Sequence, residues 1–223
     1  MTRTSCIELH NVSKNYVRGS ETVHALQDIS LNIGSGDFTA IVGHSGSGKT
    51  TLMNIMGCLD HPSGGQVILA GQAIENKTEA ELTGLRRSSI GFVFQQFFLV
   101  PTLTVLENVA LPSLFARSHA DDSRARELLD MVGLGKRLTH LPSQLSGGEM
   151  QRTAIARALV NEPPVVLADE PTGNLDSKNA EMIMRIFEQL NRDGVTIVLV
   201  THNADIVKRC ERTVHIEDGR IMQ

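Results

Sequence analysis

The sequence predicts an α/β fold with a mostly parallel sheet. A short apolar run at residues 38–42 leads into a glycine-rich loop and then into a segment whose apolar residues recur at helical spacing. Residues 165–168 form a continuous apolar run, which is typical of a central strand of a parallel sheet, and residues 195–200 form another buried strand. A helical pattern at 178–190 separates these two runs. Strands that alternate with helices in this way form parallel sheets.

The glycine-rich loop matches the pattern G-x-x-x-x-G-K-[ST] of a phosphate-binding P-loop, in the strand–turn–helix context that this motif needs. Its glycines allow positive φ, so that backbone N–H groups can surround an anion at a helix N-terminus. In this pattern Lys49 reaches the β- and γ-phosphates, and the Thr50 hydroxyl ligates Mg²⁺. The predicted nucleotide-binding residues of this segment are Gly43, His44, Ser45, Gly46, Ser47, Gly48, Lys49, Thr50 and Thr51.

A second, antiparallel β lobe is predicted beside this core. Segments 7–12 and 29–33 alternate between apolar and polar residues, and 66–70 is a short strand bounded by glycines. A small hairpin is expected at 213–222, turned by Asp218 and Gly219. The antiparallel lobe and the P-loop core would together make an α/β fold with two sheets.

The middle of the chain predicts an inserted helical lobe. A polar helix is expected at 78–87 and a buried strand at 90–94. From residue 97 to about 160, prolines punctuate several helical runs, among them 123–132 and a helix that starts near Gln151. We interpret this region as part of a single domain that spans residues 1–223.

The composition limits the function classes. The chain has 223 residues, a net charge of −4 and three well-separated cysteines, so it lacks the basic balance typical of nucleic-acid binding and the spacing of a disulfide framework. We expect a reducing compartment, no nucleic-acid partner and no secretory signal. No stretch is long and apolar enough to cross a bilayer, so any service to a membrane would go through a partner.

Two further motifs complete a nucleotide-hydrolysing constellation. Asp169 and Glu170 close the apolar run 165–168, at the strand end where α/β sheets bind ligands. Asp169 fits a carboxylate that holds Mg²⁺, and Glu170 could polarise an attacking water. Residues 145–149, Leu-Ser-Gly-Gly-Glu, precede a predicted helix and form a second anion site. One domain seldom needs two such sites for one nucleotide, which points to a nucleotide held by another copy.

In this order, the motifs resemble the nucleotide-binding domain of ATP-binding cassette (ABC) transporters over essentially the whole chain. The resemblance implies the ABC ATPase fold, with ATP and Mg²⁺ as ligands. It also implies a role for each matching residue: Tyr16 stacks on adenine, Gln95 senses Mg²⁺ and the γ-phosphate, and His202 contacts the γ-phosphate. Gln96 replaces Gln95 if the register differs by one. The turn of Ser146, Gly147, Gly148 and Glu149 would bind the partner's nucleotide, and Asp176 would lie at the dimer seam.

Glu149 departs from the family pattern, in which this position is usually Gln. A carboxylate beside a triphosphate is repulsive unless it points away. Catalysis is assigned to Glu170, His202, Gln95 and Lys49, and the metal site to Thr50, Gln95 and Asp169.

A narrower set of motifs is similar to the macrolide-exporter and lipoprotein-release branch, the MacB/LolD type. These motifs lie at 57–60, 90–97, 107–109 and 169–176. The resemblance implies an ATP hydrolase that closes as a dimer of two copies and powers a membrane permease, by export or by mechanical work across the membrane. The expected location is the cytoplasmic face of the inner membrane, peripheral and held by the permease, with a periplasmic adaptor as a further partner.

Three other classes stay open. A soluble ABC ATPase unlinked to transport usually carries a coiled coil, a zinc insertion or two fused cassettes, which this chain lacks. A P-loop kinase or GTPase leaves the 145–149 motif and His202 unexplained. A regulatory subunit without turnover conflicts with an intact Glu170.

Overall fold

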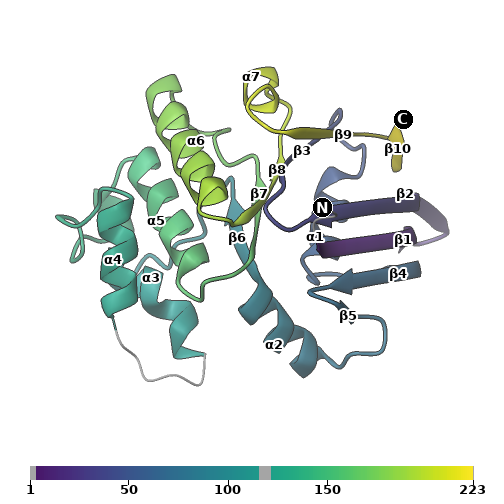
Figure 1. Cartoon of the computed structure of the whole chain (residues 1–223), viewed down its shortest axis with the longest axis horizontal. Coiled ribbons are helices and arrows are strands. Elements are labelled where there is room, and N and C mark those ends of the chain that lie inside the picture. Colours follow the sequence, from purple (N-terminus) through teal and green to yellow (C-terminus); the bar gives the residue numbers. More distant parts are fainter. Residues whose placement is uncertain (1–3, 116–121, 223) are drawn as a thin grey trace.

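The computed structural model describes residues 4–115 and 122–222. Figure 1 shows two sheets side by side, with a group of helices beyond the larger one. The larger sheet has six strands in the order β10-β9-β3-β8-β7-β6. Its strands are β3 (Phe38–Val42), β6 (Ile90–Phe94), β7 (Val165–Asp169), β8 (Thr196–Val200), β9 (Arg212–Glu217) and β10 (Arg220–Met222). All neighbours pair in parallel except β9 and β10, which confirms the predicted mostly parallel sheet.

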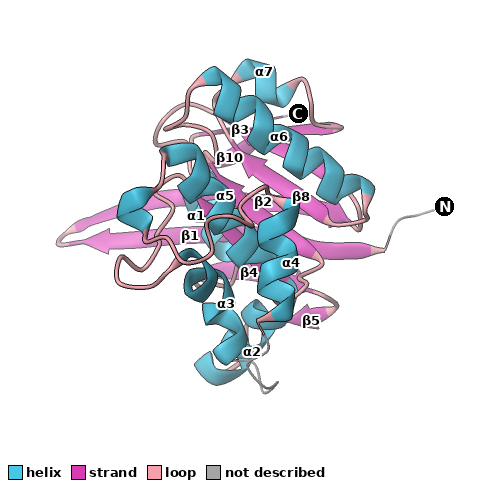
Figure 2. Ribbon diagram, turned by 90° about the vertical axis from the view of Figure 1, so that its left-hand side faces the viewer, coloured by secondary structure: helices cyan, strands magenta, loops and turns pink. Residues whose placement is uncertain are grey.

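The smaller sheet is antiparallel, in the order β2-β1-β4-β5, as predicted. Its strands are β1 (Ser5–Arg18), β2 (Glu21–Gly34), β4 (Gly64–Leu69) and β5 (Gln72–Ala73). The first two strands are much longer than the predicted segments 7–12 and 29–33. They form a hairpin that extends past the helices in Figure 2. This outer half faces solvent, so it lacks the apolar alternation from which strands are predicted.

Helices cover the sheets and fill the stretch between β6 and β7. They are α1 (Lys49–Met56), α2 (Glu79–Ser89), α3 (Val105–Leu114), α4 (Ser123–Met131), α5 (Gly147–Leu159), α6 (Ser177–Arg192) and the short α7 (Ala204–Val207), with a 3-10 turn at Pro142–Gln144. Helix α5 begins at Gly147, four residues before the predicted start near Gln151. Two successive glycines favour a turn by propensity, but the Ser146 cap stabilises helix there.

Two apolar cores hold the sheets and helices together. One lies between the two sheets and encloses α1, with Leu52, Met53, Ile55 and Met56 all fully buried. The other packs α3, α4, α5 and α6 against the opposite face of the large sheet. Because the apolar face of α1 is fully buried, the loop before the helix is held firmly at the carboxyl ends of β3, β7 and β8. In the part of the chain that the structure describes, no helix has the length and apolar character to span a membrane.

Candidate nucleotide site

A cavity of about 880 Å³ lies at the carboxyl ends of the parallel strands. It brings together residues that are far apart in the sequence: the P-loop after β3, Gln95 after β6, Asp169 and Glu170 at the end of β7, and His202 after β8. The edge of a parallel sheet is where α/β proteins bind nucleotides. The catalytic and metal-binding residues predicted from sequence all line this one cavity.

The P-loop has the conformation that a phosphate cradle requires. Gly46 and Gly48 have φ values of 80° and 104°, which favour glycine, and Gly48 caps the N-terminus of α1. The Lys49 Nζ donates to the carbonyl oxygens of Gly43 and His44, each at 2.8 Å, and so lies across the mouth of the loop. The Ser47 side chain is buried and does not line the cavity. Only its backbone could contribute to nucleotide binding.

Thr50 and Asp169 fit a divalent cation. The Thr50 Oγ1 lies 3.5 Å from Asp169 Oδ2, so two hard oxygen donors face one point of the cavity. Burial, and then the negative charge of Glu170, raise the pKa of the Asp169 carboxyl. A cation bound between these oxygens would relieve that cost. Among the described residues, no cluster of three or more His, Cys, Asp and Glu side chains could hold a metal alone, so phosphate oxygens or water would complete the shell.

Glu170 is held by the segment that follows β8. Its Oε1 accepts from the backbone N–H of His202 at 3.1 Å and lies 2.6 Å from the His202 Nδ1, while Oε2 accepts from the Thr201 hydroxyl at 3.3 Å. Glu170 itself has a φ of 43°, in the left-handed region. Such strain is commonly retained at functional sites, because the surrounding structure enforces it. The orientation of the Glu170 carboxylate is therefore fixed by its contacts with Thr201 and His202.

Gln95 is exposed at the cavity and linked to the segment beyond Glu170. Its Nε2 donates to Asn174 Oδ1, and Asn174 Nδ2 donates back to the Gln95 carbonyl, both at 3.1 Å. The neighbouring Gln96 does not line the cavity. The geometry favours Gln95 over Gln96 for the predicted sensor role.

The predicted second anion site, at residues 146–149, lies outside this cavity. Of the described residues that line the cavity, none comes from 146–149. Ser146 is exposed at the N-terminus of α5, where it forms a capping box with Glu149: Ser146 Oγ accepts from the Glu149 N–H at 3.3 Å, and Glu149 Oε2 accepts from the Ser146 N–H at 2.9 Å. Glu149 Oε1 also pairs with Arg137 at 3.1 Å. The hydrogen bond from the Ser146 N–H, assisted by Arg137, lowers the pKa of Glu149.

The capping box explains how a carboxylate at position 149 avoids repulsion from a bound triphosphate. Glu149 points back onto its own helix and is neutralised by Arg137, so it need not approach a bound phosphate. The sequence signal for this role is the spacing of Ser146 and Glu149, which matches the capping-box pattern S-x-x-E.

Asp176 caps the neighbouring helix α6. It accepts from the Asn179 backbone N–H at 2.8 Å, and this bond lowers the pKa of its carboxyl. A Cβ at Gly148 would overlap the Asn179 side chain, so only glycine lets α5 approach α6 this closely. The N-termini of α5 and α6 are thus adjacent, which brings Ser146 and Asp176 to one exposed region of the surface.

Tyr16 does not line the cavity but lies beside it. It pairs in the β1–β2 hairpin with Val23, which does line the cavity, and its hydroxyl donates to Asp60 at 2.7 Å. The cavity is also lined by residues that no sequence motif predicts: Val23, His24, Ala25 and Gln27 of β2, and Asp218 and Gly219 of the predicted turn. These residues carry no motif; they reach the cavity because β2 and β10 lie close together, with Gln27 N–H donating to the Gly219 carbonyl at 2.8 Å.

Comparisons with known proteins agree with this geometry. Residues 26–173 match the family model described as ABC transporter. An uncharacterized ABC transporter ATP-binding protein of Bacillus subtilis, YvrO, is 48% identical over 97% of this chain and 95% of its own length. A macrolide export ATP-binding/permease protein, MacB of Chlorobaculum tepidum, is 48% identical over 97% of this chain, which spans only 33% of that relative.

MJ0796 is an ATP-binding cassette of Methanocaldococcus jannaschii. Two solved structures of it superpose on this chain with a TM-score of 0.91 each. They are 48% and 47% identical, and each covers 97% of both chains. One is described as dimeric, and the other as a dimeric post-hydrolysis state bound to ADP and Pi. The chain belongs to the ABC transporter family, as an ATP-binding cassette that hydrolyses ATP.

Proposed function

We propose that this chain works as a head-to-tail dimer in which each ATP lies between the P-loop of one copy and the Ser146 turn of the other. The observation that carries the proposal is the division of the site. The cavity holds Lys49, Glu170 and His202, whereas the second anion site faces solvent at the start of α5. A helix N-terminus with exposed N–H groups favours a phosphate, and a second copy would supply one. The dimeric MJ0796 structures support this arrangement.

The chain's own groups suffice for the main tasks of phosphoryl transfer, which are positioning and neutralisation of charge. Lys49 would exchange its two carbonyl partners for β- and γ-phosphate oxygens. Glu170 and Gln95 would orient the attacking water, and His202 would contact the γ-phosphate. Thr50 and Asp169, with Gln95, would hold Mg²⁺, which when bound supplies positive charge that offsets the charge of the triphosphate.

Dimer closure would follow from the same contacts. The γ-phosphate would touch both copies, so ATP would bind the closed dimer more tightly than the open one, and hydrolysis would remove that preference. Within one copy the two half-sites are mechanically linked, because the buried Gln151 of α5 donates to the Pro171 carbonyl at 2.7 Å, next to Glu170. A change at Glu170 can therefore reach the start of α5.

Complementation between two inactive variants tests the shared site. Lys49→Met removes the charge from the P-loop, and Ser146→Arg obstructs the second half-site. Each homodimer therefore has no complete site. A mixed dimer has one complete site. Mixing equal amounts should restore roughly a quarter of the wild-type phosphate release, because half of random dimers are mixed and each has one site in two. Full activity of Ser146→Arg alone, or no gain on mixing, would refute the shared site.

A separate apolar groove of about 470 Å³ supports a membrane permease as the partner. It lies between α2, β6, the end of α3 and α5, and it is lined by Phe92, Phe94 and Phe115, with Arg86 and Arg87 beside them. Phe115 is 69% exposed, which is unusual for so large an apolar side chain. An amphipathic helix with acidic residues would complement this surface.

The groove and the nucleotide cavity are lined by consecutive residues of the chain. Phe94 lines the groove, and Gln95 beside it lines the cavity. Arg157 of α5 lines the groove as well and donates to the carbonyls of Phe97 and Phe98 at 2.7 and 2.6 Å. A helix seated in the groove would thus sense the segment that follows β6, which gives ATP a route to the permease.

Replacing Phe115 with Asp should detach the chain from its membrane partner. Most of the chain should be lost from the membrane fraction of native cells, and no polytopic protein should copurify with it. ATP hydrolysis by the isolated chain should stay within about twofold of wild type, because surface substitutions have small effects. Met131→Asp is the matched control, because Met131 on α4 is 48% exposed but lies outside the groove. If both variants behave alike, the groove is not the docking site.

The domain bounds, the type of permease and the location are proposed from the resemblance to ABC transporter cassettes. We propose one domain over residues 1–223, with a helical lobe at about 97–160. We propose a permease of the MacB/LolD type, since the MacB relatives are named macrolide export ATP-binding/permease proteins. The chain would then lie at the cytoplasmic face of the inner membrane, and a periplasmic adaptor would be a further partner of the assembly.

A further inference from the structure

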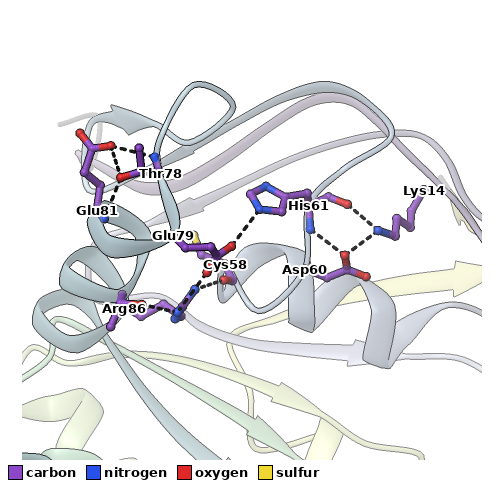
Figure 3. A network of polar contacts seen from close by, with 9 residues as sticks. Lys14, Cys58, Asp60, His61, Thr78, Glu79, Glu81 and Arg86 are labelled. Carbon is purple, nitrogen blue, oxygen red and sulfur yellow. Dashed lines mark hydrogen bonds and ion pairs between the residues drawn. The ribbon is translucent and has the colours of Figure 1, made fainter.

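A compact polar network surrounds Asp60, outside the motifs of the nucleotide site. Figure 3 shows the Lys14 side chain and the His61 backbone nitrogen facing the Asp60 carboxylate, whereas the His61 ring points toward Glu79. The Lys14 Nζ donates to Asp60 Oδ1 at 2.6 Å and to the His61 carbonyl at 2.7 Å, and the His61 backbone N–H donates to Asp60 Oδ1 at 2.7 Å. Lys14 is only 9% exposed, and a buried ammonium group is unfavourable unless it is paired. The network is therefore held tightly in one arrangement.

Tyr16 is the third group bound to this carboxylate. Its hydroxyl donates to Asp60 Oδ2 at 2.7 Å, within the range of a charge-assisted bond. The Lys14 Nζ also lies 4.9 Å from the centroid of the Tyr16 ring, as a cation–π pair. The ring is thus fixed at its hydroxyl by Asp60 and over one face by Lys14.

The charges of the network are consistent with this arrangement. Partial burial would raise the pKa of Asp60, but the hydrogen bonds from Lys14, Tyr16 and the His61 N–H outweigh it, so the pKa of this carboxyl is lowered. Burial, and then the contact with Asp60, raise the pKa of Tyr16. Asp60 is therefore an anion and Tyr16 a neutral donor at neutral pH.

The network also fixes Tyr16 relative to the P-loop. Asp60 follows helix α1 and is attached to it, because the backbone N–H groups of Leu59 and Asp60 donate to the Asn54 carbonyl at 2.8 and 3.3 Å. The same helix begins at Lys49 of the P-loop. One short, buried helix thus carries the phosphate cradle at one end and the partner of Tyr16 at the other.

We propose that Asp60 is a positioning residue that holds the Tyr16 ring at the distance from the P-loop at which the base of a bound nucleoside triphosphate lies. Tyr16 lies opposite Val23 of the cavity lining, so its ring is at the edge where a base would extend from the phosphates. The inference rests on the proposed function, in which Tyr16 stacks on adenine. The Tyr16 hydroxyl and the Asp60 carboxylate, together with the Tyr16 ring, would then give the chain its preference for a nucleotide over a bare polyphosphate.

The test compares Tyr16→Phe, Asp60→Asn, the double variant and His61→Ala. Tyr16→Phe keeps the ring and leaves the Lys14–Asp60 pair intact, so it remains informative if Asp60→Asn is poorly folded. His61→Ala is the matched control, because His61 joins the network through its backbone and its side chain is exposed. The measurements are KM and kcat for ATP and the dissociation constants of ATP and inorganic tripolyphosphate.

Tyr16→Phe and Asp60→Asn should each raise KM and the ATP dissociation constant about tenfold, the lower end of the range expected for one lost hydrogen bond to a charged group, and His61→Ala should change neither. The value of kcat and the affinity for tripolyphosphate should not change. The double variant should be no weaker than Asp60→Asn alone, because both substitutions remove the same contact. Additive effects, or an equal loss of tripolyphosphate affinity, would mean that the network only stabilises the fold and would overturn the proposal.

Tyrosine fluorescence supplies an independent readout. Tyr16 is the only Tyr in the chain, which has no Trp, so the emission reports this ring alone. ATP should change the emission of the wild type, and tripolyphosphate should not. A wild type that responds to neither and releases no phosphate from ATP would overturn the proposed function itself. A wild type that hydrolyses ATP, beside Asp60→Asn and Tyr16→Phe variants with unchanged KM, would overturn only the role of Asp60.

Discussion

Replacing Glu170 with Gln should reduce phosphate release at least about a hundredfold, the lower range for loss of a general base. Gln has nearly the same shape, and its amide oxygen can still accept from the His202 N–H, which now donates to the carboxylate at 3.1 Å. What is lost is the negative charge that polarises the attacking water. ATP binding should persist, because Lys49 and the loop are untouched.

A second consequence distinguishes this variant from one that merely fails to bind. If hydrolysis opens the dimer, blocking hydrolysis should trap the closed form, so size-exclusion chromatography with ATP and Mg²⁺ should give a dimer. Glu79→Gln is the matched control, since Glu79 lies on α2 and does not line the cavity. A Glu170→Gln protein that stays monomeric with ATP and Mg²⁺ would contradict the closure scheme.

The parts of the fold that could be predicted are those whose signals are local. Strands β3 and β8 are buried at every residue, so their sequences are apolar except for one buried threonine in each, Thr39 and Thr196. The P-loop is also local, because its glycines, Lys49 and Thr50 are consecutive and their roles follow from backbone geometry. The order of motifs then identified the edge of the sheet at which Gln95, Glu170 and His202 would meet.

Features decided by contacts between distant segments were less predictable. The start of α5 at Gly147 depends on the Ser146 cap and on close packing against Asn179, so local propensity alone indicated a turn. The outer half of the β1–β2 hairpin is exposed and lacks an apolar pattern. The contacts of Lys14 and Tyr16 with Asp60 join residues more than 40 positions apart, and no spacing rule connects them.

The P-loop also allows a stability prediction that separates conformation from contact. Gly48→Ala should lower the free energy of unfolding by about 2–5 kcal/mol, combining left-handed strain with overpacking. At Gly48, a Cβ would lie 2.6 Å from the carbonyl oxygen of Ala25 and 3.0 Å from the Leu26 side chain, in the strand that covers the loop. Because a backbone oxygen cannot rotate away, either β2 or the loop would have to move. The measurement is urea denaturation without nucleotide.

Gly46→Ala is the matched control for this effect. Gly46 also has a positive φ, 80°, but no atom lies within 4 Å of where its Cβ would be. The free energy of unfolding of Gly46→Ala should therefore fall only by the cost of the left-handed conformation, about 1–2 kcal/mol. The difference between the two variants measures how rigidly β2 is held against the phosphate cradle. Equal losses would mean that β2 yields at little cost, and the hairpin that carries Val23 and Tyr16 would then be too loosely held to fix a base relative to the P-loop.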